Sequence, residues 1–131
     1  MEIKKVVIEV IPHKEQRYPT AGDWQFLGKD LIIRVSDMNN WKSEMAVARH
    51  EFDEACLCLS RGIKGEDVDN FDFLFEKELA DGKHDPDDEP GDDPRAPYHK
   101  EHAIATVGEM SFCIDLGIEW KEHEANIFSL F

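Results

Sequence analysis

The order of the expected elements assigns the chain to the α+β class. Apolar, β-branched runs fall within about the first 35 of the 131 residues, and the helical periodicities all come after them. Strands and helices that are segregated along a chain in this way pack as a small sheet against helices. We therefore predict a single domain over residues 1–131, in which an antiparallel or mixed sheet, with its strands at about residues 3–35, packs on three main helices.

Two strands are expected before the helices begin. Ile3–Ile11 is rich in Val and Ile and ends at Pro12, and Leu31–Val35 is a second β-branched run. The stretch between these runs is polar and is typical of a loop, with a short additional strand expected around Trp24–Leu27.

Helical periodicity follows these strands to the end of the chain. Asp37 or Asn39 can cap the first helix, and Gly62 suits the residue that ends it. A strongly acidic loop is expected between the second and third helices, and a short last helix is expected after Glu119. The main helices are predicted at about residues 39–61, 66–79 and 98–116, and the loop at 81–94.

The charge of the chain excludes several classes of partner. The 29 acidic residues against 15 basic ones give a net charge of -14, which repels nucleic-acid phosphates and anionic membranes. No apolar run approaches the roughly 18 residues of a membrane span, and the first residues are typical of a strand rather than of a signal peptide. The cysteines fit reduced thiols in a cytoplasmic protein; they are Cys56, Cys58 and Cys113.

The first helix is predicted to be apolar on two sides. His50 and Glu54 lie one turn apart on the side opposite the main core stripe, with Val47 and Leu57 beside them. An element of this kind is sandwiched between layers, so His50 and Glu54 are expected to be at least partly buried. The core stripe comprises Trp41, Met45, Ala48, Phe52, Ala55 and Leu59.

The third helix carries polar groups in the middle of its apolar arc. His102, Thr106, Glu109 and Cys113 form this stripe at spacings of four, three and four. A buried carboxylate without a partner is costly, so Glu109 needs a metal ion, a histidine or a hydrogen-bond network. Apolar residues flank the stripe on both sides: Ala103, Val107, Met110 and Ile114 on one, and Tyr98, Ala105, Phe112 and Leu116 on the other.

If the two helices pack together, their polar groups can converge. Two imidazoles and one or two carboxylates, from His50, Glu54, His102 and Glu109, suit a divalent metal, most naturally Zn²⁺. Glu51 would then stand beside the ion as a candidate general base for a bound water. Three other histidines lie in polar surroundings and are expected at the surface; they are His13, His84 and His123. His99, three residues before His102, is expected to be an exposed residue of the first turn beside the loop.

The segment His50-Glu51-x-x-Glu54 resembles the HExxH helix of zincin-like metallopeptidases, and the overall character is similar to small phage-encoded zincin-like proteins of unknown substrate. The resemblance implies a zincin-like fold and a zinc-dependent hydrolase of amide or peptide bonds, or a degenerate relative of one. Glu54 stands where the family has its second histidine. The implied ligands are therefore His50, Glu54 and His102, with Glu109 as an alternative ligand or as the partner of an imidazole.

Two other interpretations stay open. Glu51-x-x-Glu54 followed by Glu66-x-x-Asp69 resembles the ExxE…ExxD signature of all-α nucleoside triphosphate pyrophosphohydrolases, in which carboxylates hold Mg²⁺. A non-enzymatic protein that binds a protein partner through the acidic residues 81–93 is the third class.

Overall fold

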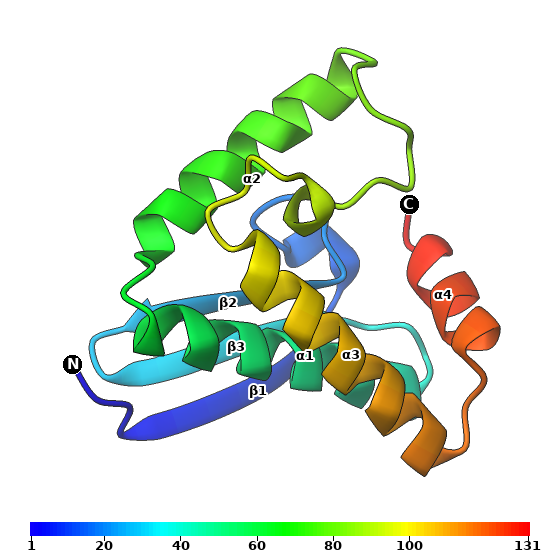
Figure 1. The fold of residues 1–131 in the computed structure, drawn as a ribbon. Coiled ribbons are helices and arrows are strands. Elements are labelled where there is room, and N and C mark those ends of the chain that lie inside the picture. Colours follow the sequence, from blue (N-terminus) through cyan, green and yellow to red (C-terminus); the bar gives the residue numbers. More distant parts are fainter.

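The computed structural model describes all residues, Met1–Phe131, and confirms the α+β class (Figure 1). A three-stranded mixed sheet comes first in the chain, and four helices follow it. The strands are β1 (Lys5–Ile11), β2 (Gly22–Leu27) and β3 (Asp30–Ser36), and the helices are α1 (Trp41–Ser60), α2 (Gly65–Ala80), α3 (His99–Leu116) and α4 (Trp120–Phe128).

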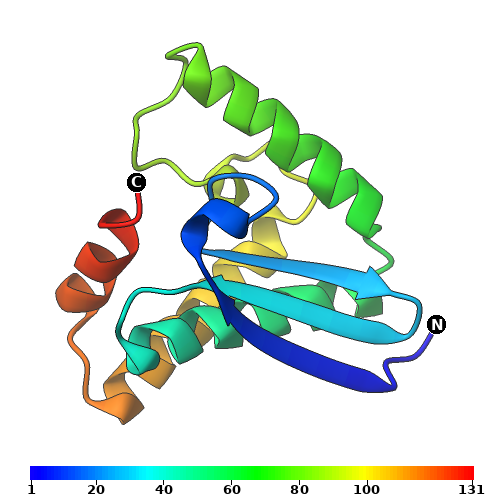
Figure 2. The same cartoon turned by 180° about the vertical axis from the view of Figure 1, so that it is seen from behind.

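β3 lies in the middle of the sheet, which has the strand order β1-β3-β2. β2 and β3 are antiparallel and are joined by a tight turn at Gly28, whose φ of 64° favours glycine. β1 runs parallel to β3 and forms the opposite edge, as the view from behind shows (Figure 2). The central strand is the most deeply buried, with no solvent exposure at Leu31, Ile33 and Val35.

α1 is capped by a residue other than the two expected ones. The cap is Asn40 rather than Asp37 or Asn39, because its side chain accepts a hydrogen bond from Ser43 N at 3.1 Å. Asn39 instead adopts a left-handed conformation with φ 55°. Gly62, with φ 72°, follows the end of the helix as predicted.

The expected core stripe of α1 is only partly buried. Ala48 and Ala55 are in the core, whereas Trp41 is 61% exposed and Phe52 is also exposed. α1 packs over β2 and β3 but makes little contact with β1, so the side of the helix that faces β1 stays open. The assignment of Trp41 and Phe52 to the core stripe was therefore wrong.

α3 crosses α1 on the side away from the sheet, so α1 is sandwiched between two layers as predicted (Figure 1). His102, Glu109 and Cys113 face inward and are buried. The apolar flank beside them is not covered by any element, and Val107 and Ile114 are 66% and 77% exposed. None of the helices combines the length and apolarity needed to cross a membrane.

Candidate metal centre

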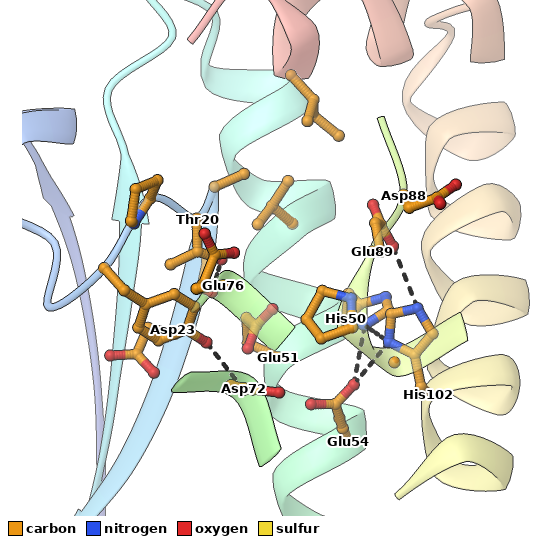
Figure 3. A pocket seen from close by; sticks show the side chains of 18 of the residues that line it. Thr20, Asp23, His50, Glu51, Glu54, Asp72, Glu76, Asp88, Glu89 and His102 are labelled. Carbon is orange, nitrogen blue, oxygen red and sulfur yellow. Dashed lines mark hydrogen bonds and ion pairs between the residues drawn. The ribbon is translucent and has the colours of Figure 1, made fainter. Parts of the chain in front are cut away.

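Three buried side chains from two helices bring one atom each to a common point (Figure 3). His50 and Glu54 lie one turn apart on α1, with His50 Nε2 3.1 Å from Glu54 Oε2. α3 supplies His102, whose Nδ1 lies 3.0 Å from Glu54 Oε2 and 3.2 Å from His50 Nε2. The packing of α3 on α1 thus produces the convergence that the sequence predicted for these three residues.

The spacing of these atoms suits one divalent cation. Atoms held about 2.1 Å from an ion lie about 3.0 Å apart at a 90° angle and about 3.4 Å apart at the tetrahedral angle. The three observed separations, 3.0, 3.1 and 3.2 Å, fall between these values. Two imidazole nitrogens and a carboxylate oxygen are also a donor set that Zn²⁺ accepts. His50, Glu54 and His102 could therefore hold a metal ion.

Glu54 is oriented by a residue that the sequence did not single out for this role. Trp24 on β2 donates its indole N–H to Glu54 Oε1 at 3.0 Å, and both side chains are buried. The other carboxylate oxygen is left to face the two imidazoles. No local motif connects Trp24 with Glu54, because the contact arises only when β2 packs on α1.

The far nitrogen of His50 faces a second carboxylate. His50 Nδ1 lies 2.8 Å from Glu109 Oε1, within ion-pair distance although not aligned as a regular hydrogen bond. Glu109 also contacts His123 Nε2 at 2.5 Å, and His123 Nδ1 lies 3.0 Å from Ser43 Oγ. Glu109 therefore lies behind an imidazole rather than among the three converging atoms, which fits the second of its two predicted roles.

His123 is fully buried, contrary to the surface position expected for it. Its place follows from the apolar spacing of α4, where Trp120, His123 and Ile127 recur at three and four residues. The same spacing of three and four residues predicted an inward position for His102 on α3, and it was present in the sequence around His123 as well.

The far nitrogen of His102 faces the acidic loop. Nε2 lies 3.1 Å from Glu89 Oε2 and 3.4 Å from Asp92 Oδ1, which form a second acidic group around this ring. Gly91 packs so closely on the imidazole that a Cβ there would lie 2.3 Å from His102 Cγ. The segment around residues 89–92 therefore lies against the site. In the sequence, the available indication of this position was the Pro90-Gly91 pair within an acidic stretch.

The electrostatics of the site depend on mutual pairing of buried charges. Burial lowers the pKa of His50 and of His102, but the carboxylates around each ring outweigh it and raise these pKa values to about 10 and about 12. Burial conversely raises the pKa of Glu54, and the two imidazoles lower it to about 2. A cation bound here would replace two protons that the imidazoles otherwise hold.

Glu51 lines the cleft that opens beside these residues, which has a volume of about 160 Å³. Its carboxylate makes no hydrogen bond or ion pair, and burial together with the charge of Glu54 raises its pKa well above 4.5. Asp72 lies farther along the cleft and accepts hydrogen bonds from Tyr98 and Tyr18. The cleft is lined by many acidic side chains and by no Lys or Arg, so it attracts cations and repels phosphates.

The carboxylates of the pyrophosphohydrolase interpretation are not gathered into one group. Glu66 is exposed and does not line the cleft. Asp69 is paired with Arg17, with Arg17 Nη1 3.0 Å from Asp69 Oδ2. Asp69 lines the same cleft as Glu51 and Glu54. Because Glu66 does not, the four carboxylates are not gathered at one point.

Comparison with known proteins identifies no relative. No protein-family model matches the chain, and neither a curated protein nor a solved structure resembles it at a significant level.

Proposed function

We propose that the protein is a zinc-dependent hydrolase of zincin-like type, with a metal held by His50, Glu54 and His102. The observation that carries this proposal is the convergence of three buried ligand atoms at 3.0–3.2 Å from one another. Two imidazoles that approach so closely need at least one N–H between them in the absence of a cation. A cation would instead be met by a lone pair from each of the three atoms.

The surroundings of each ligand support the same proposal. Metal-bound histidines usually donate their other N–H to a carboxylate, which fixes the orientation of the ring. Glu109 stands at the far nitrogen of His50, and Glu89 stands at the far nitrogen of His102. Trp24 plays the equivalent part for Glu54.

The chemistry would take place at the wall of the cleft. A bound Zn²⁺ lowers the pKa of a coordinated water and polarises a carbonyl group. Glu51 directly follows the ligand His50, lines the cleft and has a carboxylate without a partner, so it is placed to accept a proton there. A substrate with a neutral amide or peptide bond suits this acidic cleft better than a phosphate ester.

Metal analysis of chelator-free protein tests the ligand set. We expect about one Zn²⁺ per chain in the unchanged protein and less than about one tenth of that in His50→Ala. His84→Ala is the matched control, because His84 also pairs with a glutamate, Glu78, at 3.0 Å but lies outside the cleft. A metal-free unchanged protein, or equal zinc content in all three, would reject the metal site.

A peptide library read by mass spectrometry tests the reaction. We expect zinc-dependent cleavage that falls by at least about 100-fold in Glu51→Gln while the zinc content is retained. If the unchanged protein binds zinc but cleaves nothing, the metal site stands and the hydrolase does not.

A further inference from the structure

β1 is an open edge of the sheet over its whole length. It pairs with β3 on one side only, and no other strand lies beyond it (Figure 2). Natural proteins usually protect such an edge with proline, a bulge, a short strand or charged side chains, because its free N–H and C=O groups can pair with another chain. β1 has seven residues, Lys5–Ile11, with no proline among them.

The edge also exposes apolar side chains. Val6, Ile8 and Val10 are 43–46% exposed although β-branched residues of this kind are usually buried. They are in register with the core residues of β3, so they point to the face of the sheet that carries α1. α1 does not extend over β1, and this row of side chains is left uncovered.

β1 carries two exposed residues of opposite charge, and each could pair with the other residue type on a second copy of the strand. Lys5 and Glu9 lie four residues apart, on the other face of the strand, and neither forms an ion pair within the chain. Arg34, the β3 neighbour of Glu9, donates instead to Gln25 at 2.8 Å. In an antiparallel pair of β1 strands centred on Val7, each Lys5 lies opposite the Glu9 of the other copy.

We propose that two copies of the chain pair through antiparallel β1 strands centred on Val7. Val6 of each copy then lies opposite Ile8 of the other, and the free backbone groups of the two edges bond to each other. Two sheets join into one continuous sheet about a twofold axis. The net charge of -14 per chain opposes most other contacts between copies, whereas β1 and its flank carry Glu2, Lys4, Lys5 and Glu9, which sum to zero.

Charge reversal with rescue tests this pairing. Sedimentation equilibrium of the full chain, from about 5 to about 500 µM at about 0.15 M salt, should show a monomer–dimer equilibrium. Lys5→Glu and Glu9→Lys should each raise the dimer Kd by about tenfold or more, since each places like charges opposite twice. The double variant Lys5→Glu/Glu9→Lys restores both pairs and should return the Kd to within about threefold of the original. Both side chains are exposed, so the melting temperature measured well below the dimer Kd should not change.

A cross-link reports the register independently. Under mild oxidation Val7→Cys should form a disulfide between the two introduced thiols, one from each copy, identified by mass spectrometry of the peptides. Ile8→Cys is the matched control and should cross-link much less, because two residues at position 8 are only diagonal neighbours in this register. A chain that stays monomeric throughout, a dimer that ignores the charge reversals or is not rescued, or stronger cross-linking at position 8 would each overturn the proposal.

Discussion

Two buried histidine–glutamate clusters lie side by side in this molecule, and they differ in how their atoms are used. In the first, His50, Glu54 and His102 bring three ligand atoms to one point. In the second, His123 has Ser43 at one nitrogen and Glu109 at the other, with no group competing for either. Each cluster contains a buried histidine beside a buried glutamate, so the presence of such a pair does not separate a metal site from an internal pair.

The geometry does separate them. His123 spans two partners on opposite sides of its ring and satisfies both nitrogens. His50 and His102 instead turn one nitrogen each toward the same carboxylate oxygen and toward each other. The first arrangement stabilises a fold, and the second leaves a point at which a cation would satisfy three groups at once. Glu109 connects the clusters, because it contacts both His50 and His123.

The largest contrast is expected in metal affinity. His102→Gln removes a proposed ligand and should weaken Zn²⁺ binding by more than about 100-fold, the upper range for loss of an outer partner. His123→Gln touches the site only through Glu109 and should weaken binding by less than about tenfold. Competition with a chromophoric chelator measures both. Equal losses would show that the two clusters do not differ as argued.

The opposite contrast is expected in the stability of the metal-free protein. His123→Ala leaves the buried Glu109 without its 2.5 Å partner and should lower the free energy of unfolding by about 4 kcal/mol. His84→Ala breaks a less buried histidine–glutamate pair and should cost less than about 1 kcal/mol. Urea unfolding measures both changes. A loss for His123→Ala as small as that of His84→Ala would contradict a structural role for His123.

The stability of the metal-free fold and the stabilisation added by zinc should depend on pH with opposite signs. The pKa of His50 is raised to about 10 in the metal-free fold, so its stabilising contribution is complete below about pH 6.5 and is lost as the pH rises toward 10. We expect His50 alone to lower metal-free stability by on the order of 3 kcal/mol from pH 7 to 10, and His102, whose pKa is raised to about 12, adds to this fall. The stabilisation added by zinc should grow over the same range, because fewer protons then compete for the imidazoles.

Thermal melts with and without zinc measure this pair of slopes. His50→Gln is the control and should remove the part of the metal-free slope that comes from His50. Parallel slopes for the two forms would mean that zinc does not bind at these imidazoles.

The smallest expected effect concerns the orientation of Glu54. Trp24→Phe keeps an aromatic ring in the core but removes the N–H that Glu54 Oε1 accepts at 3.0 Å. We expect about 1.5 kcal/mol lower stability and about tenfold weaker zinc binding. Trp120→Phe is the matched control, because Trp120 packs on His123 at 5.2 Å between ring centroids and should leave zinc affinity unchanged. An equal loss in both variants would assign the effect to packing alone.

Much of the fold and part of the site could be predicted from local patterns. The α+β class follows from the segregated order of strands and helices, and the inward stripe of α3 follows from spacings of three and four residues. The same wheel placed His50 and Glu54 on the side of α1 that meets α3. Whether the three residues bind a metal stays a prediction.

Other features could not be predicted because they depend on which neighbour covers a face. The wheel groups Trp41 and Phe52 with Ala48 and Ala55, yet of these four residues only the two alanines are buried in the core. It likewise cannot show that Trp24 reaches Glu54 from a strand thirty residues away in the chain. These contacts are set by the docking of elements, on which a helical period carries no information.

The amino-acid sequence by itself therefore determined the kinds of elements, their order and the polar groups that each helix turns inward, because these follow from backbone periodicity and from the cost of burying charge. The tertiary structure alone decided which inward groups share a point, which carboxylate or indole holds each of them, and that β1 is left as an open edge. Those outcomes depend on distances between segments far apart in the chain, and such distances are fixed only when the layers pack.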